Sequence, residues 1–293
     1  MAQEVWTVRR ILSWTTGYLE RKGDEHPRLS AEWLLSNATG FSRVEIYMNF
    51  DYPLSPDELD LMRAGVRRRG AGEPLQYVTG EMPFRHIVLR CERGVLIPRP
   101  ETEILVDAAL EGVDACDGDM PRVLDIGTGT GCIACSIANE REDAIVIATD
   151  LSAQAVTLAR RNVEALGLGG RVDVVECDLA TSVPRELEGT FDVLVSNPPY
   201  IPSGVVPTLP VEVQGFEPGL ALDGGADGLD VFRRILFEAP RLLAPGGLLC
   251  VELFEANVHQ AADLVRQQEG WASAEVRQDL THRPRVLVAV RQR

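Results

Sequence analysis

The feature that most constrains this sequence is an apolar run, Val123–Ile126, that leads directly into the glycine-rich segment Gly127–Gly131. The apolar run predicts a buried strand over Arg122–Ile126, and the glycines predict a tight turn that opens a helix ending near Asn139. Because glycine lacks a Cβ atom, the backbone at such a turn can approach a ligand closely, and the following helix N-terminus offers free N–H groups. The segment therefore predicts a strand, a ligand-binding turn and a helix in direct succession.

Apolar runs and helical patterns alternate through the whole of residues 101–293. Further strands are predicted at residues 144–149, 172–176, 191–195, 248–253, 274–279 and 286–290. Helices are predicted at residues 102–110, 152–166, 229–243 and 256–267. Because strands that alternate with helices are typical of a parallel sheet, this region is predicted to be an α/β domain with a doubly wound, mostly parallel sheet.

The N-terminal part of the chain has a different pattern. Helices are predicted over residues 5–21, from Ser30, and over residues 56–69, the last preceded by the N-cap residue Ser55 and starting with Pro56. Residues 71–100 are interrupted by glycines and prolines and are predicted to form a linker with a β-hairpin near residues 84–90. The predicted domains are a small helical domain (1–70), this linker (71–100) and the α/β domain (101–293).

Charge is unevenly distributed along the 293 residues. The net charge of −15 belongs to residues 91–293, because residues 1–90 contain 12 basic and 12 acidic residues. An acidic larger domain argues against general nucleic-acid binding, which depends on neutralising phosphates. Arg63, Arg67, Arg68 and Arg69 form either a small basic patch or a solvated helix face. The neutral balance of the N-terminal domain suggests a separate surface that recognises a protein substrate.

The sequence also bears on location and on metal binding. No run approaches the ~18 apolar residues that a membrane helix needs, and no signal peptide is visible at the N-terminus, so a cytoplasmic protein is expected. Cys132 and Cys135 form the one C-x-x-C pair, with neither a second pair nor nearby histidines. We therefore expect no metal site, and interpret these cysteines as small buried residues on a helix.

Three successive strand ends of the α/β domain offer groups that suit one nucleoside ligand. The first is the glycine-rich turn; its spacing departs from the dinucleotide fingerprint, which would need glycine where Cys132 stands. Asp150 follows the second strand and suits both hydroxyls of a ribose, and Asp178 follows the third and suits an adenine amino group. The pattern is that of S-adenosylmethionine (SAM) in a class I, Rossmann-like methyltransferase.

Ser196-Asn197-Pro198-Pro199-Tyr200 follows the fourth strand and indicates the methyl acceptor. The nitrogen of an amide or an exocyclic amine is a poor nucleophile because its lone pair is conjugated. The side-chain oxygen of Asn197 and the carbonyl of Pro198 can accept both of its N–H groups and aim the lone pair at the methyl group. Pro198 and Pro199 stiffen the loop, and Tyr200 can stack on the planar acceptor.

Several further segments resemble a known family. They are Gly72-x-Pro74-x-Gln76-Tyr77-x-x-Gly80, Phe84, Val95-Leu96-Ile97-Pro98-Arg99-Pro100-Glu101-Thr102-Glu103 and Glu217-Pro218-x-x-Ala221-Leu222-x-Gly224-Gly225-x-x-Gly228-Leu229. Together with Asn-Pro-Pro-Tyr they are similar to the HemK/PrmC family, the glutamine methyltransferases of peptide chain release factors. The resemblance covers essentially the whole chain.

This resemblance implies a function in translation termination: methylation of the glutamine in the Gly-Gly-Gln loop of class I release factors, with SAM as methyl donor. It assigns the cofactor to Gly127, Thr128, Gly129, Thr130, Gly131, Asp150, Asp178, Leu179 and Asn197. It assigns the substrate glutamine to Asn197, Pro198, Pro199 and Tyr200, of which Asn197, Pro198 and Tyr200 are the expected catalytic residues. The expected partner is the release factor, with neither a membrane nor direct nucleic-acid binding.

Other functions remain open on the sequence alone. A methyltransferase acting on a glutamine of a ribosomal protein would share every catalytic residue. An adenine-amino methyltransferase would share Asn-Pro-Pro-Tyr, but the acidic domain and the lack of a recognisable base-recognition domain argue against it. A non-catalytic SAM-binding protein is disfavoured because Asn197 and the glycine-rich turn are intact.

Overall fold

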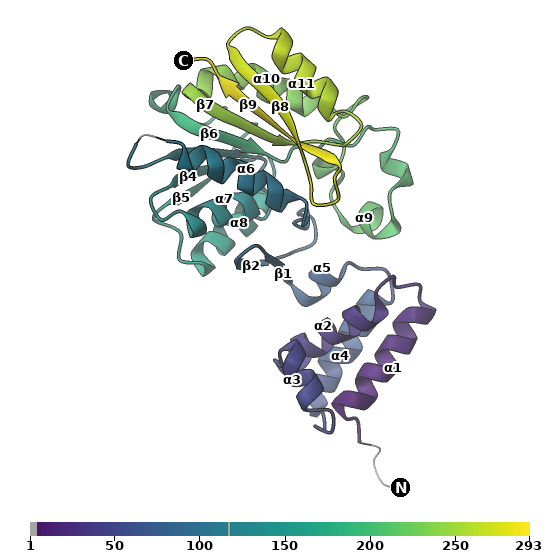
Figure 1. Ribbon diagram of the computed structural model, residues 1–293. Helices are drawn as coiled ribbons and strands as arrows, with labels where there is room; N and C mark the ends of the chain where they lie inside the picture. Colours follow the sequence, from purple (N-terminus) through teal and green to yellow (C-terminus); the bar gives the residue numbers. More distant parts are fainter. Residues whose placement is uncertain (1–4, 117) are drawn as a thin grey trace. The chain divides into compact units, whose positions relative to one another are not determined.

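A seven-stranded sheet organises the larger of the two compact units into which the chain folds (Figure 1). The computed structural model describes residues 5–116 and 118–293. One unit contains the described residues up to Glu81 together with Pro210–Phe216, and the other contains Met82–Leu209 and Glu217–Arg293.

The sheet is mixed, with a parallel core and an antiparallel edge. Its strands are β3 (Arg122–Ile126), β4 (Ile145–Asp150), β5 (Val172–Glu176), β6 (Phe191–Ser196), β7 (Leu243–Glu252), β8 (Trp271–Gln278) and β9 (Pro284–Arg291). Their order is β5-β4-β3-β6-β7-β9-β8, in which β3 to β7 are parallel and β9 is antiparallel to both β7 and β8. The predicted doubly wound, mostly parallel sheet is confirmed.

Helices cover both faces of this sheet. They are α6 (Thr102–Asp114), α7 (Cys132–Glu140), α8 (Ala153–Ala165), α10 (Asp230–Leu242) and α11 (Val258–Gln267). Neighbouring residues along each strand face opposite sides, so Val123 packs among residues of α6, α7 and α8, whereas Leu124 packs among residues of α10 and α11. The order in which strands are added to the sheet reverses at β3, with β4 and β5 on one side and β6 and β7 on the other. The carboxyl ends of β3 and β6 therefore form a topological switch point, the usual ligand site of such sheets.

The predicted hairpin is present and belongs to the larger unit. Strands β1 (Glu81–Phe84) and β2 (Ile87–Arg90) form a two-stranded sheet. Phe84 and Leu89 are buried in the same core cluster as α7. Between the strands, the Arg85 guanidinium pairs with Glu140 at 2.6 Å and with Asp107 at 2.7 Å. The hairpin is thereby fixed to the α6–α7 side of the domain.

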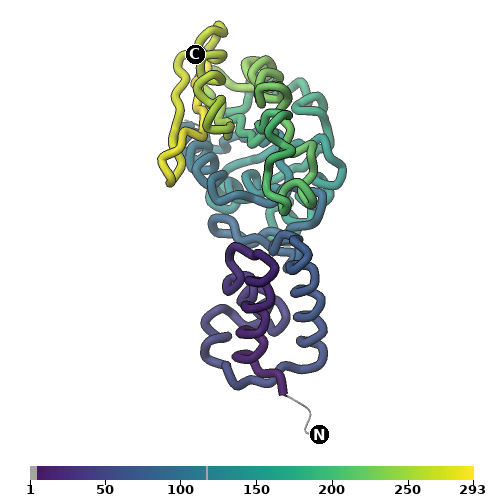
Figure 2. Tube along the Cα trace, turned by 90° about the vertical axis from the view of Figure 1, so that its right-hand side faces the viewer, coloured from purple at the N-terminus to yellow at the C-terminus, as the bar shows by residue number. Residues whose placement is uncertain are grey.

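The smaller unit is helical, and in two views its longer helices lie side by side (Figures 1 and 2). Its helices are α1 (Val8–Arg21), α2 (Pro27–Thr39), α3 (Arg43–Met48), α4 (Pro56–Arg69), α5 (Leu75–Thr79) and α9 (Val211–Phe216). Ser55 caps α4 as predicted, accepting from the Glu58 N–H while the Glu58 carboxylate accepts from the Ser55 N–H. Buried Arg69 binds Asp24 at 2.7 Å and Glu212 of α9 at 2.8 Å.

Several boundaries differ from the sequence prediction: α6 continues to Asp114 and does not end at residue 110, and β8 begins at Trp271 and not at residue 274. Residues 71–81 lie in the helical unit and not in a linker, because α5 packs against α2 and α4 and Asn37 donates to the Thr79 carbonyl. Strand β7 begins at Leu243 and not at Leu248. Leu243 pairs with Phe191 across an irregularity at Pro245–Gly247, where Gly246 has a φ of 84°, so the proline and glycines form a bulge within the strand.

Candidate functional site

A cavity opens at the carboxyl ends of β3, β4 and β6. Ile126 and Ser196 are register partners on adjacent strands, and the Ser196 hydroxyl donates to the Ile126 carbonyl at 2.7 Å. The turn after β3 and the loop after β6 therefore begin side by side. The predicted site residues that line the cavity are Gly127, Thr128, Gly129, Thr130, Asp150, Asp178, Leu179, Asn197, Pro198 and Pro199; Gly131 and Tyr200 are not among the residues that line it.

The glycine-rich turn leaves open space where side chains would stand. Gly127 and Gly129 have φ values of 75° and 58°, in the left-handed region that favours glycine, and a Cβ atom on either would meet no atom within 4 Å. Gly131 differs: its φ is 84°, and a Cβ atom would lie 3.4 Å from the Ala159 Cβ and the Cys135 Sγ. Gly127 and Gly129 thus keep the backbone accessible, whereas Gly131 lets α7 begin against α8.

Asp150 is held by backbone donors at the cavity. Its Oδ2 accepts from the Gly129 N–H and its Oδ1 accepts from the Ser152 N–H, both at 2.8 Å. Burial raises the pKa of Asp150, and these hydrogen bonds oppose that rise. The carboxylate is therefore oriented before any ligand arrives, and each oxygen keeps lone-pair capacity for a further donor.

Asp178 and Leu179 also line the cavity. Asp178 Oδ2 pairs with the Arg234 guanidinium at 2.7 Å, a partner on α10 that the sequence analysis did not identify. The next residue, Leu179, has a φ of 52°, which is uncommon outside glycine. The ion pair leaves lone pairs on the Asp178 carboxylate for a further donor.

Asp125, near the end of β3, holds the glycine-rich turn through hydrogen bonds. It is fully buried, and its Oδ2 accepts from the Thr128 hydroxyl at 2.6 Å and from the Ala134 N–H at 3.2 Å. Burial, with a smaller contribution from the charge of Asp150, raises the pKa of Asp125 to about 7. Asp125 was not predicted as a site residue; the structure identifies it as the residue that fixes the turn to the start of α7.

The loop after β6 is held at both of its ends. Asn197 Nδ2 donates to the Thr102 hydroxyl at 3.1 Å, and the Tyr200 hydroxyl donates to Glu252 Oε1 at 3.0 Å. Burial beside the Glu252 carboxylate raises the pKa of Tyr200. The Tyr200 ring packs against the core cluster of α10 and α11. In the described structure its contacts therefore support the loop.

The glycine-rich segment 217–229 packs on the backbone of the same loop. Ile201 donates to the Leu222 carbonyl at 3.0 Å, and Gly224 donates to the Ile201 carbonyl at 2.9 Å. A Cβ atom at Gly224 would lie 2.7 Å from the Pro199 oxygen, and one at Gly228 would lie 2.3 Å from the Tyr200 oxygen. These two glycines are needed for this close approach.

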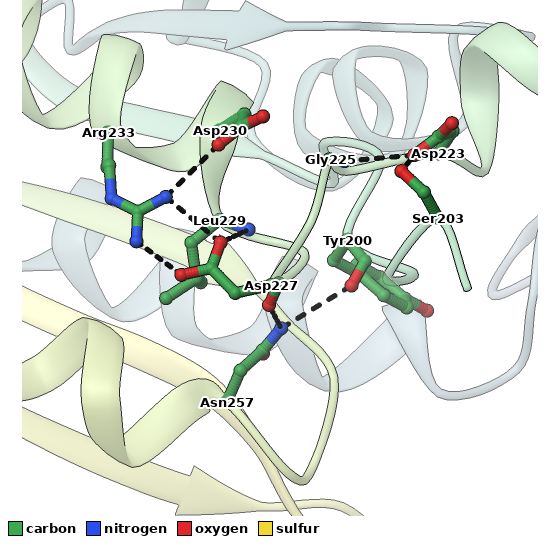
Figure 3. A network of polar contacts seen from close by, with 9 residues as sticks. All are labelled: Tyr200, Ser203, Asp223, Gly225, Asp227, Leu229, Asp230, Arg233 and Asn257. Carbon is green, nitrogen blue, oxygen red and sulfur yellow. Dashed lines mark hydrogen bonds and ion pairs between the residues drawn. The ribbon is translucent and has the colours of Figure 1, made fainter. Parts of the chain in front are cut away.

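Asn257 forms hydrogen bonds to both the loop after β6 and the glycine-rich segment 217–229. Figure 3 shows its amide pointing toward the main chain of Tyr200 and Asp227, and its Nδ2 donates to both carbonyls, at 3.4 Å and 3.2 Å. It is buried at the start of α11. No motif in the sequence marked Asn257, because its partners are backbone atoms of distant residues.

Two of the segments quoted for the family resemblance meet at the cavity. Arg99 lines the cavity, and its guanidinium donates to both carboxylate oxygens of buried Glu217 at 2.7 Å. This charge-assisted contact joins the segment around residues 95–103 to the start of the glycine-rich segment.

The arginines of α4 do not form an open basic patch. Arg63 pairs with Asp60, Arg68 with Glu73 at 2.6 Å, and Arg69 with Asp24. Three of the four charges are thus neutralised locally.

Cys132 and Cys135 are both buried on α7, and burial raises the pKa of both thiols. Within residues 5–116 and 118–293, no three histidine, cysteine, aspartate or glutamate side chains cluster in a way that could hold a metal ion. Over the same part of the chain, no helix is long and apolar enough to span a membrane.

Two family models match the sequence. Residues 10–80 match the PrmC N-terminal domain, and residues 103–208 match the methyltransferase small domain. The first match ends within one residue of the boundary of the helical unit at Glu81.

Curated relatives match the chain over nearly its full length. The release factor glutamine methyltransferase of Chlorobaculum tepidum is 40% identical over 296 residues, covering 99% of each chain. The release factor glutamine methyltransferase of Geobacter sulfurreducens is 46% identical over 250 residues, covering 85% of each chain.

Among solved structures, the hMettl16 catalytic domain in complex with a MAT2A 3′UTR hairpin superposes with a TM-score of 0.56 at 15% identity. The match covers 81% of this chain and 82% of that one. The delta-N METTL16 MTase domain gives a TM-score of 0.52 at 18% identity, covering 76% of this chain and 95% of that one. At these identities the likeness shows the fold alone, that of a class I methyltransferase.

Proposed function

This chain belongs to the family of release factor glutamine methyltransferases, and we propose that it methylates the side-chain amide nitrogen of the glutamine in the Gly-Gly-Gln motif of class I peptide chain release factors. The methyl donor is S-adenosylmethionine. The observation that carries the proposal is the shared cavity: the glycine-rich turn and Asp150 line it together with Asn197 and Pro198. Donor-binding groups and acceptor-binding groups therefore face one space.

The cavity has features that fit the cofactor. Open space beside Gly127 and Gly129 allows a ligand to contact the backbone closely. The Asp150 carboxylate is fixed by two N–H groups and retains lone pairs for the two hydroxyls of a ribose. We assign the cofactor to Gly127, Thr128, Gly129, Thr130, Asp150, Asp178, Leu179 and Asn197, with Gly131 shaping the turn.

The residues after β6 prepare the acceptor nitrogen. When bound, S-adenosylmethionine supplies a methyl group on a positively charged sulfur. Asn197 Oδ1 and the Pro198 carbonyl accept the two N–H groups of the substrate amide, which weakens the conjugation of the nitrogen lone pair and directs it toward the donor. Pro199 stiffens this arrangement. Tyr200 contributes by holding the loop through Glu252, and stacking of its ring on the substrate is not needed for the proposal.

The helical unit is proposed to recognise the release factor. Residues 1–90, which contain most of this unit, have no net charge, in contrast to −15 for residues 91–293, and residues 10–80 match the PrmC N-terminal domain model. Deletion of residues 1–81 is expected to raise the KM for release factor sharply while the dissociation constant for SAM stays near that of the full chain. Normal methylation of intact release factor by a folded, SAM-binding truncated enzyme would contradict this role.

Parallel acceptor assays test the proposed function against its alternatives. Purified enzyme and labelled SAM are incubated separately with a release factor, with ribosomal proteins and with adenine-containing DNA and RNA. We expect label on the release factor alone. Label on a ribosomal protein would identify the enzyme as the related ribosomal-protein glutamine methyltransferase, and label on nucleic acid would identify an adenine methyltransferase. A translation factor as substrate agrees with the cytoplasmic location expected from the sequence.

A further inference from the structure

We propose that Thr102 and Glu252 form a positioning relay that fixes which end of the Asn197 amide faces the cavity. The inference rests on the proposed function, in which the Asn197 oxygen holds the substrate amide. Thr102 is the first residue of α6 and Glu252 is the last residue of β7. Neither was identified as a site residue from the sequence.

The relay consists of two hydrogen bonds in series. The Thr102 hydroxyl donates to Glu252 Oε2 at 2.7 Å, and Asn197 Nδ2 donates to the same hydroxyl oxygen at 3.1 Å. Thr102 is 1% exposed and Glu252 is 0% exposed, so solvent does not compete for either bond. Both contacts lie within the larger unit.

The carboxylate determines the direction of the chain of hydrogen bonds. Burial raises the pKa of Glu252, and the hydrogen bonds from the Thr102 and Tyr200 hydroxyls oppose that rise by stabilising the ionised form. The ionised carboxylate only accepts, so the single hydroxyl proton of Thr102 points to Glu252. The hydroxyl oxygen then has only lone pairs to offer Asn197, which must present its NH2 group. As a consequence, Asn197 Oδ1 is left for the cavity, where an acceptor is needed to hold a substrate N–H.

Glu252 also holds the other end of the loop. Its Oε1 accepts from the Tyr200 hydroxyl at 3.0 Å, so one buried carboxylate controls both the first and the last residue of Asn197–Tyr200. Burying a carboxylate is costly unless it is well hydrogen-bonded, and both of these donors are neutral hydroxyls. A role in orienting the loop explains why an acidic residue occupies this position.

The first test compares two substitutions at one position. Thr102→Val keeps the side-chain shape but removes the hydroxyl, and Thr102→Ser keeps the hydroxyl. Single-turnover methylation at saturating SAM is expected to slow about 10- to 100-fold in Thr102→Val, because the side-chain amide of Asn197 is no longer held in one orientation. Thr102→Ser should retain most of the rate, and the dissociation constant for SAM should stay near the wild-type value in both.

Thr190→Val is the control. The Thr190 hydroxyl also makes a hydrogen bond within the larger unit, to the Leu187 carbonyl at 2.8 Å, but Thr190 directly precedes β6, at the end of that strand opposite the cavity. This variant measures the effect of removing a hydrogen-bonded threonine hydroxyl, and its single-turnover rate should equal that of the wild type. A normal rate in Thr102→Val would overturn the proposal, as would equal losses in Thr102→Val and Thr102→Ser, which would indicate a packing role.

A second measurement does not depend on the substrate. NMR of enzyme with ¹⁵N-labelled asparagine follows hydrogen exchange of the Asn197 side-chain NH2, assigned by loss of its signal in Asn197→Asp. Exchange should be slow in the wild type and in Thr102→Ser, and at least tenfold faster in Thr102→Val. Equal exchange rates in all three would refute the relay. Failure of the wild type to methylate release factor would instead refute the proposed function and leave this readout valid.

Discussion

The two halves of the cavity are built differently. On the side proposed to bind the cofactor, Asp150 is oriented by the backbone N–H groups of Gly129 and Ser152, and the turn Gly127–Gly131 is held by Asp125 of the preceding strand. On the acceptor side, Asn197–Tyr200 is held by side chains and glycines from distant segments, among them Thr102 and Asn257. The difference teaches that the turn and Asp150 are held by contacts between successive strand ends, whereas the loop after β6 depends on segments up to 95 residues away in the sequence.

The largest expected effect is on the acceptor side. Asn197→Ala removes one oriented hydrogen-bond acceptor for the substrate amide. Loss of a comparable preorganised hydrogen-bonding group costs about 3–4 kcal/mol, or about 10²–10³ in kcat. SAM affinity should fall much less, because the glycine-rich turn, Asp150 and Asp178 remain. Single-turnover rates beside equilibrium SAM binding measure both quantities. A near-normal rate would reduce Asn197 to a turn residue.

Asn197→Asp refines the same comparison. It keeps an acceptor oxygen, but it places a negative charge beside the positively charged sulfur of the cofactor. The charge favours the ground state over a transition state in which the positive charge is dispersed, so kcat should also fall. A rate equal to that of the wild type would show that only an oxygen, and not a neutral amide, is required.

The next effect is on the cofactor side. Asp150→Ala is expected to weaken SAM binding by about 1.5–3 kcal/mol, because it removes charge-assisted hydrogen bonds to two hydroxyls. It should lower the rate at saturating SAM far less than Asn197→Ala does. Calorimetric titration checks the affinity, and unchanged SAM binding would reject the assignment of Asp150 to the ribose.

Gly228→Ala tests whether the acceptor loop depends on the packing of a distant segment. The added Cβ would lie 2.3 Å from the Tyr200 oxygen, at a φ of 77°. Clash and backbone strain together are expected to lower the free energy of unfolding by about 1–3 kcal/mol and to slow methylation.

Gly189→Ala is the control for the strain alone. Gly189 has a similar φ of 69°, but a Cβ atom there would meet nothing within 4 Å. It should lose less stability than Gly228→Ala and keep the wild-type methylation rate. Equal effects of the two substitutions on rate would contradict the account of the acceptor loop.

The smallest effect on the methylation rate is expected at Asp125, which supports the glycine-rich turn, and the prediction for this residue concerns stability. Burial raises the pKa of Asp125 from 3.8 to about 7, so the folded state binds this proton more tightly than the unfolded state. Its contribution to stability is therefore fully present below about pH 4 and is lost as the pH rises through 7. Asp125→Asn cannot ionise and should gain stability relative to the wild type between pH 5 and pH 8. Melting temperatures that differ by a constant amount across this range would contradict the prediction.

The sequence predicted the fold of the larger unit well because its signals are local. The Val123–Gly131 segment contains its strand, turn and helix start in one stretch, and the structure has β3 at the predicted residues. The supports of the acceptor loop were not predicted. Thr102 and Glu252 are 150 residues apart in sequence and meet only through the order of the strands and helices.

The short helices were not predicted from the sequence either. Helix α9, six residues long, and α5, five residues long, have too few turns for a helical period to be visible. Their packing against the other helices of the N-terminal unit determines their place, which is why the helical unit extends to Glu81 and includes Pro210–Phe216.

Mass mapping of the methylated residue tests the central claim most directly. Release factor is incubated with the enzyme and SAM, digested, and its peptides are fragmented to locate the added methyl group. We predict a single methyl group on the side-chain nitrogen of the glutamine in Gly-Gly-Gln, absent when Asn197→Ala replaces the wild type in a reaction of the same duration. A methyl group on another residue, or an unmodified release factor beside a SAM-binding enzyme, would contradict the account.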